Sequence, residues 1–368
     1  MHNQNEMQAK LKRLRDLMEA EELEGIYLKR QDNFSWLTCG GTSYLGVGDM
    51  GNCGLLVTAT EQFAITNRIE APRMIAEEKL EELGFPVLAD IWLNETFEND
   101  TIRKICPGGK VGYDFLAGSG VNLAGKIQPL RYSLLPNEIE RYQEAGKIFS
   151  RAVEEAISVI RPGDTELKAV SRLIANMRKD GLWTVSSFCT SDERIYNFRH
   201  AIPTEKPIRE RVQFGGNFRY KGLVLCCTRY LNLVPITEEL HKQYMDNVMI
   251  DCTYIHHSKP GVSYQVPFQA GRKAYDSLGY PGEFEKHHQG GPIGYAGRDF
   301  LVNNSREGII PENQAFCWNP SITGTKSEDT VISTAKGALF LTYPVIFPSV
   351  KVTVEGTEYV RPYILEKL

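Results

Sequence analysis

The segment RVQFGGNFRYKGLVLCCTRY, residues 211–230, is the first of three distinctive stretches in the C-terminal half of this 368-residue chain. The other two are EKHHQGGPIGY (285–295) and AFCWNPSITGTKSEDTVIST (315–334). They are preceded by a long amphipathic helical pattern, 133–164, which has Pro136 near its start and ends in Arg-Pro-Gly-Asp. Together these segments predict a domain in which long helices precede a set of strands.

The rest of the C-terminal half has the same mixed character. A second helix is expected over 166–181, and the chain from 183 onward consists mostly of predicted strands and turns. Two more helices are expected over 237–258 and 264–279. The change near residue 132, where a long amphipathic helical pattern begins, predicts two domains, 1–132 and 133–368.

The N-terminal part alternates predicted helices with predicted strands, which indicates an α/β domain. Apolar residues at helical spacing predict a helix over 7–23, and CGLLVTATEQFAITN (53–67) has the pattern of two strands around a turn. We expect DNFSWLTCG (32–40) to form a loop and a short strand. A further helix is expected over 71–84, ending at a glycine.

Composition and charge exclude several classes of protein. The chain is 42% hydrophobic and 24% charged, with a formal net charge of −4 and no basic cluster, so we expect no nucleic-acid partner. No apolar run approaches the ~18 residues of a membrane span, and we expect no membrane contact. The eight cysteines form no CxxC pair, and the N-terminus lacks the apolar core of a signal peptide, so we expect a cytoplasmic protein.

In this order, the three segments and the helix before them resemble the aminopeptidase P, prolidase and creatinase family. The resemblance is strongest over 136–334 and weaker over 1–132. It implies the fold class: an α/β (α+β) protein with a creatinase-like N-terminal domain, 1–132, and a pita-bread catalytic domain, 133–368.

The resemblance also locates the metal site of that family, where two Asp, one His and two Glu hold two ions that activate a bridging water. In this chain the second Glu alone is retained, before Asp-Thr-Val. The five positions are occupied by Phe214 or Gly215, depending on a one-residue gap, and by Cys226, Gly291, Asn319 and Glu328. We therefore expect no bound metal of the usual kind and no cofactor.

Histidines are the main catalytic candidates that remain. The resemblance places His200, in TSDERIYNFRHAIPTEKPI, over the substrate, and an imidazole can donate and accept a proton near neutral pH. His287, His288 and Glu328 are expected to converge with it in the cleft, and His288 could reach the His ligand position if the loop were shifted. His256-His257 lies outside the family motifs and is interpreted as structural or surface.

Six further residues are predicted to contact the substrate. Arg229 and Arg298 could clamp a substrate carboxylate. The N-terminal residues are included because that domain reaches towards the active site in the family, often from a partner subunit. The predicted substrate-binding residues are Asn319, Arg229, Cys226, Arg298, Arg68 and Tyr44.

Three functions are compatible with these residues. By analogy with creatinase, the first is metal-independent hydrolysis of a C–N bond in a small molecule, with His200 as general acid and base and Glu328 holding a cationic or amide group. The second is a metal-dependent Xaa-Pro aminopeptidase or dipeptidase. The third is an inactive, peptidase-like binding module. The expected partner is a small-molecule or short-peptide substrate, and the resemblance alone implies a homodimer.

Overall fold

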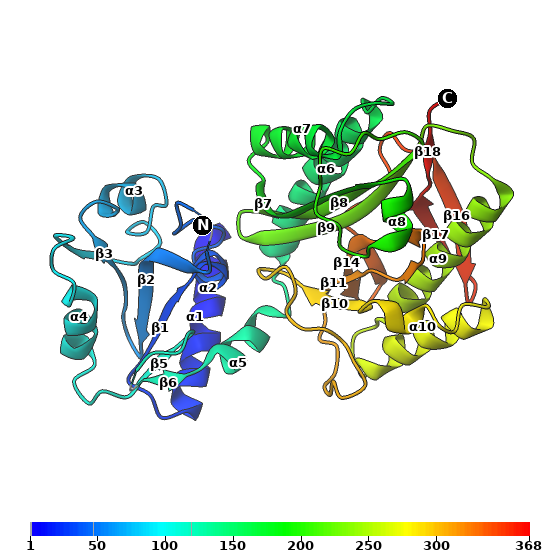
Figure 1. The fold of residues 1–368 in the computed structure, drawn as a ribbon. Coiled ribbons are helices and arrows are strands. Elements are labelled where there is room, and N and C mark those ends of the chain that lie inside the picture. Colours follow the sequence, from blue (N-terminus) through cyan, green and yellow to red (C-terminus); the bar gives the residue numbers. More distant parts are fainter. Residues whose placement is uncertain (1, 47, 119) are drawn as a thin grey trace. The chain divides into compact units, whose positions relative to one another are not determined.

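The computed structural model describes residues 2–46, 48–118 and 120–368 (Figure 1). The chain divides into two compact units, Met1–Glu138 and Ile139–Leu368, because most contacts lie within one unit or the other. The division falls a few residues beyond the position near 132 that the sequence indicates. None of the helices in the described ranges combines the length and the apolarity that crossing a bilayer requires.

The first unit is built on one mixed six-stranded sheet, in the order β4-β3-β2-β1-β5-β6. Strands β1, β2 and β3 are antiparallel neighbours, and the outer strands pair in parallel. The strands are β1 (Gly25–Arg30), β2 (Met50–Thr58), β3 (Gln62–Asn67), β4 (Val87–Asp90), β5 (Val111–Tyr113) and β6 (Val121–Asn122). The predicted pair of strands over 53–67 is confirmed as β2 and β3.

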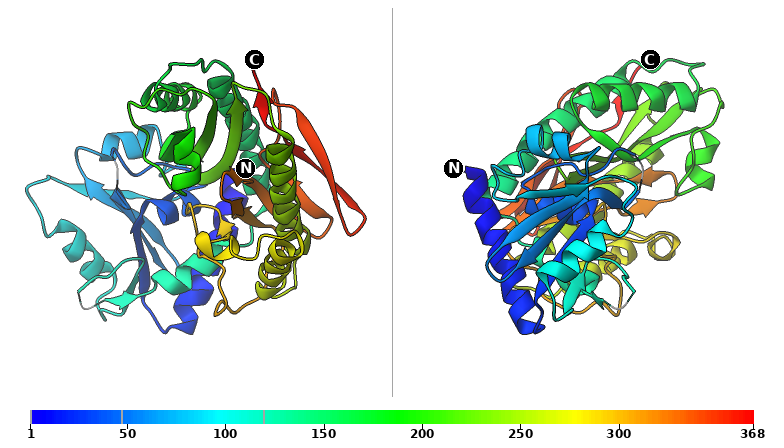
Figure 2. Two further views of the ribbon diagram at one scale, coloured as in Figure 1. Left: turned by 45° about the vertical axis from the view of Figure 1, so that its right-hand side comes forward. Right: turned by 90° about the vertical axis from the view of Figure 1, so that its left-hand side faces the viewer.

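Helices cover both faces of this sheet, with α1 on one side and α4 on the other (Figures 1 and 2). The amphipathic pattern of α1 buries Met7, Leu11, Leu14 and Met18, which confirms the predicted N-terminal helix. The helices are α1 (His2–Ala20), α2 (Gln31–Leu37), α3 (Ala71–Ala76), α4 (Phe97–Ile105), α5 (Ala124–Ile127) and the short 3₁₀ helix η1 (Gln128–Arg131).

Two local predictions in this unit are wrong. The segment 32–40 is largely helix α2 instead of a loop and strand, and all seven of its side chains are buried. So short and evenly buried a helix has no apolar stripe to reveal it in the sequence. The helix predicted over 71–84 stops at Ala76, because the Glu78 carboxylate accepts hydrogen bonds from the Thr42 amide and Arg73, and Lys79 adopts a φ of +54°.

The second unit contains two four-stranded sheets and two small hairpins. The first sheet has the order β18-β9-β8-β7 and the second β10-β11-β14-β15. The first comprises β7 (Trp183–Ser191), β8 (Arg211–Tyr220), β9 (Leu223–Asn232) and β18 (Leu365–Glu366), and the second β10 (Gly290–Ile293), β11 (Gln314–Trp318), β14 (Asp329–Thr334) and β15 (Gly337–Phe340). The hairpins are β12 (Ser321–Ile322) with β13 (Thr325–Lys326), and β16 (Ser349–Val354) with β17 (Thr357–Pro362).

Each of the two sheets has its own pair of helices. Helices α6 (Pro136–Ser158) and α7 (Glu166–Lys179) precede the first sheet, and α9 (Glu238–His257) and α10 (Gln265–Ser277) precede the second. Helices α9 and α10 pack side by side (Figure 2). Two short helices, α8 (Glu193–Asn197) and η2 (Phe284–Lys286), stand in the connections. The helices predicted over 166–181, 237–258 and 264–279 are confirmed to within two residues at each end. The helix predicted over 133–164 is confirmed but is shorter at both ends.

Direct contacts join the two sheets where β9 meets β14. The Thr330 hydroxyl donates to the carbonyl oxygen of Cys226 and accepts from the Cys226 amide, both at 2.9 Å. Close by, the Thr228 amide donates to the Glu328 carbonyl at 3.1 Å. Glu328 is therefore fixed at the junction of the sheets.

A fully buried ion-pair network ties the sheets to the helices behind them. Arg229 on β9 pairs with Glu154 on α6 at 3.2 Å and with Asp329 on β14 at 2.9 Å. Arg361 on β17 pairs with Asp329 and with Asp251 on α9, both at 2.8 Å. Since all five charged groups have opposite-charge partners, the network can exist inside the core without an isolated charge.

Candidate functional site

Three histidines from two separate connections lie together in the second unit. His200 follows α8, and His287 and His288 directly follow η2. The Nε2 atoms of His200 and His287 are 3.0 Å apart, and the rings of His287 and His288 stack with centroids 4.3 Å apart. The ring of Phe188 on β7 stacks against the His200 ring, with the two ring centroids 5.9 Å apart. The structure thus brings the three predicted histidines into one cluster, while their catalytic roles stay a prediction.

The surroundings of this cluster favour uncharged imidazoles. Burial, reinforced by the positive charge of Lys326, lowers the pKa of His287 to about 2. Burial and the charges of Arg298 and Lys326 lower the pKa of His288 to about 4. The pKa of the exposed His200 is also lowered, by partial burial and then by Lys326. All three rings are therefore neutral at pH 7, and each has one nitrogen that can accept a proton.

Glu328, the retained carboxylate, is held by three neighbours. Its Oε2 accepts a hydrogen bond from the Thr228 hydroxyl at 2.6 Å and forms an ion pair with the Lys326 Nζ at 2.7 Å. The Cys317 thiol donates to Oε1 at 3.5 Å. Burial alone would raise the pKa of Glu328, but Lys326 and these hydrogen bonds outweigh it and lower the pKa to about 2. The carboxylate is therefore ionised and already paired with a cation of the protein itself.

This pairing changes the role expected for Glu328. The creatinase analogy gives it a cationic or amide group of the substrate to hold. In the structure the Lys326 ammonium occupies that position at the carboxylate. A cationic substrate would have to displace Lys326 or share a single carboxylate with it.

The positions that correspond to the other metal ligands do not fit a pair of metal ions. A Cβ on Gly215 would lie 2.1 Å from the Cys227 carbonyl oxygen, and one on Gly291 would lie 2.7 Å from the Phe300 carbonyl oxygen. Neither backbone position accepts a ligand side chain without rearrangement. Cys226 is fully buried, and Asn319 is a neutral amide whose buried Oδ1 has no hydrogen-bond partner among the described residues. With one carboxylate left, two closely spaced cations would not be neutralised.

The three histidines are the one group of possible metal ligands found among the described residues, with nitrogen atoms within 4.8 Å of one another. Such a spacing is near what a single transition-metal ion needs. The fixed charges are unfavourable, because Lys326 and Arg298 both act on the cluster as positive groups and Glu328 alone opposes them. This charge balance disfavours a cation among the three rings.

Two of the predicted substrate-binding residues are enclosed. Arg229 is fully buried in the ion-pair network with Glu154 and Asp329, which leaves no guanidinium edge for a substrate. Cys226 is buried next to Cys317. Both side chains are fully buried, Arg229 among its ion pairs and Cys226 beside the thiol that contacts Glu328, so neither is accessible to a substrate in this structure.

The other predicted contacts have different surroundings. Arg298 is half-buried, and its Nη1 donates to the carbonyl oxygens of Gly291 and Cys317 at 2.8 and 2.5 Å. It therefore braces the loop beside the histidines. Arg68 and Tyr44 belong to the first unit, where Arg68 is exposed beside Asp90 and Tyr44 is buried.

Two residues near the histidines were missed by the sequence reasoning. Lys326 ends β13 two positions before Glu328, and their charged groups lie 2.7 Å apart. That spacing, in the quoted segment TKSEDT, is the signal that could have revealed the pair. Phe188 has no such signal, because only the fold brings its ring on β7 against His200 in the connection after α8.

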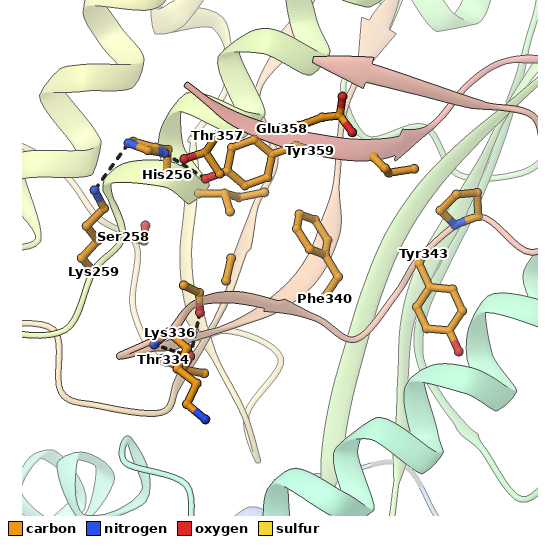
Figure 3. A pocket seen from close by; sticks show the side chains of 15 residues that line it. His256, Ser258, Lys259, Thr334, Lys336, Phe340, Tyr343, Thr357, Glu358 and Tyr359 are labelled. Atoms are coloured by element: carbon orange, nitrogen blue, oxygen red, sulfur yellow. Dashed lines mark hydrogen bonds between the residues drawn. The ribbon is translucent and has the colours of Figure 1, made fainter. Parts of the chain in front are cut away.

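The structure also contains a cavity of about 630 Å³ outside this cluster (Figure 3). It is lined by β15, β17 and the C-terminal end of α9, and none of its described lining residues belongs to the predicted site. His256 in this cavity is hydrogen-bonded through Nδ1 to the Tyr359 hydroxyl at 3.0 Å. The structural interpretation of His256-His257 agrees with these contacts.

The family assignment follows from comparison with known proteins. The model of metallopeptidase family M24 matches residues 140–336, and the chain belongs to that family. Among curated proteins, an uncharacterized peptidase, YqhT, of Bacillus subtilis (strain 168) is 21% identical over 359 residues, covering 91% of this chain and 98% of its own.

Solved structures confirm the fold class predicted from the sequence. An Xaa-Pro dipeptidase from Bacillus anthracis is similar with a TM-score of 0.75 at 20% identity, covering 98% of this chain and all of its own. A dipeptidase from Pyrococcus horikoshii OT3 reaches a TM-score of 0.77 at 18% identity, covering 91% and 98% of the two chains. The second unit thus has the pita-bread fold, and the protein is peptidase-like.

Proposed function

We propose that this protein hydrolyses a C–N bond in a small amide or short peptide-like molecule, with His200 as general acid and base and without the pair of metal ions of its family. The main support is the 3.0 Å approach of the His200 and His287 Nε2 atoms beside the retained Glu328. An imidazole that is neutral near pH 7 can take a proton and return it, which is the chemistry that amide hydrolysis needs, and the contact with His287 holds the His200 ring in place.

The exposure of the three rings supports a division of roles. His200 and His288 are exposed and can meet a substrate, whereas His287 is half-buried and contacts His200 through its Nε2 atom. Because the pKa of His287 is lowered to about 2, this ring stays neutral and can accept the hydrogen bond that orients His200. His288 stacks on His287 and limits its rotation.

A metal-dependent Xaa-Pro aminopeptidase or dipeptidase is the second candidate, because the chain belongs to a metallopeptidase family and a similar structure is described as an Xaa-Pro dipeptidase. We expect the purified protein to hold much less than one equivalent of metal and to leave an Xaa-Pro dipeptide uncleaved with or without added Mn²⁺. Metal analysis and a dipeptide assay check this, followed by a screen of small amides, guanidino compounds and cyclic amidines. Stoichiometric metal with Mn²⁺-dependent cleavage would replace the proposed function with the dipeptidase.

The pH dependence of hydrolysis gives a further prediction. The general base must be neutral, so kcat/KM should fall as the pH drops through the pKa of His200. Burial and Lys326 lower that pKa from the usual value of about 6.5, Glu328 opposes them, and the His287 and His288 rings face the same side chain. We expect the acidic limb of the kcat/KM profile below pH 6.5. A midpoint at or above 6.5 would contradict this assignment of the base.

The oligomeric state and the cellular location of the protein stay predictions. A homodimer and a cytoplasmic location rest on the family resemblance and on composition. An inactive binding module would need no converging imidazoles, so the cluster of His200, His287 and His288 favours an enzyme over that alternative.

A further inference from the structure

Lys326 occupies an unusual position for a lysine. It ends the short strand β13, and its side chain is 9% exposed, with Nζ 2.7 Å from the Glu328 carboxylate. Glu328 is the one position at which this chain keeps a metal ligand of its family. The ammonium therefore stands at hydrogen-bond distance from the carboxylate that, in metal-dependent relatives, faces a cation.

The charge of Lys326 reaches the whole cluster. It acts as a positive group on His200, His287 and His288 alike. A small cavity of about 10 Å³ adjoins both Lys326 and His287, and Gln213 and Ser321 complete part of its lining. Space of this size holds a single oxygen atom of a water or of a substrate.

We propose that the Lys326 ammonium serves as the built-in cation of this site and polarises the carbonyl group of the substrate. This inference rests on the proposed function. Water attacks the carbonyl carbon, and His200 takes the proton of the water. The oxyanion that forms lies against the ammonium, which stabilises it as a hydrogen-bond donor does in an oxyanion hole. His200 then gives the proton to the leaving nitrogen, the C–N bond breaks, and the products are a carboxylic acid and an amine.

The same arrangement selects a class of substrate. Glu328 is already neutralised by Lys326, and Arg298 adds a second positive charge near His288. A guanidinium or ammonium group would meet net positive charge here, whereas a neutral or anionic amide would not. The substrate is therefore a neutral or anionic amide and not a cationic guanidino compound.

The test compares Lys326→Met and Lys326→Arg with the wild-type protein, using the best neutral or anionic amide from a screen. We expect Lys326→Met to lower kcat by about 10²-fold with little change in KM, as for loss of one oxyanion donor. Lys326→Arg should retain more activity than Lys326→Met, and added ethylamine should restore part of the activity of Lys326→Ala. Lys351→Met, which removes an exposed lysine, is the matched control.

Because Lys326→Met leaves Glu328 without its cation, folding is checked by circular dichroism. The double variant Lys326→Met/Glu328→Gln removes both charges together and should fold while staying as inactive as the single variant. Full activity in a folded Lys326→Met or double variant would overturn the inference and leave the proposed function intact. A preference for guanidino substrates would also overturn it. Absence of amide hydrolysis by the wild-type protein would remove both.

Discussion

Replacement of Arg361 by methionine should lower the free energy of unfolding of the second unit by about 3–5 kcal/mol. Arg361 is 1% exposed, and its Nη2 lies 2.8 Å from both Asp251 and Asp329. Methionine fills much of the space but leaves the buried Asp251 carboxylate without a cation. Asp329 keeps Arg229 as a partner, so most of the cost falls on Asp251.

Urea denaturation with separate fitting of the two units measures this loss. Lys351→Met on the neighbouring strand β16 is the control, because its exposed pair with Glu358 should contribute less than about 1 kcal/mol. A loss for Arg361→Met no larger than that of the control would contradict the role given to the network.

The loss should also depend on pH. Burial already raises the pKa of Asp251, and removal of Arg361 would raise it further. A carboxyl group whose pKa is raised by folding destabilises the protein once the pH is high enough to ionise it in the unfolded chain. The difference between variant and wild type should therefore shrink as the pH falls towards about 4, where unfolded Asp takes up its proton.

The sequence predicted the architecture well because its longest elements carry strong patterns. The helices over 166–181, 237–258 and 264–279 have apolar faces that must be buried, and the structure places them as α7, α9 and α10. Helix α2 was missed because a seven-residue helix buried on all sides has no polar face to set its period. The early end of α3 depends on Glu78 and its contacts with Thr42 and Arg73, which no local pattern encodes.

The candidate site was predicted only in part, for a similar reason. The positions of His200, His287 and His288 in the family motifs were enough to predict that the three side chains lie together. Motif position could not say that Arg229 points into the core, because its partners Glu154 and Asp329 come from distant elements. Nor could it show that Lys326 neutralises Glu328, although the two residues are close in the sequence. Which charged side chains pair depends on how the elements pack, so these pairs become visible only in the structure.

Replacement of His200 by alanine should lower kcat/KM by about 10²–10⁴-fold, the range for removal of a general acid or base. The side chain is exposed, and its contacts are with Phe188, His287 and His288, so the change should affect folding little. Kinetics of the best amide substrate measure the loss. His241→Ala removes another exposed histidine with a single side-chain hydrogen bond, to Tyr363, and should keep full activity.

The pH profile separates an acid–base role from a positional one. If His200 only filled space against Phe188, the alanine variant would be slower but would keep the acidic limb of kcat/KM. If His200 carries the proton, that limb should disappear, because His287, with a pKa of about 2, does not titrate in the measured range. The loss should lie mainly in kcat, since proton transfer belongs to the transition state. A retained limb with a raised KM would assign His200 to substrate binding and leave the general base to be found elsewhere.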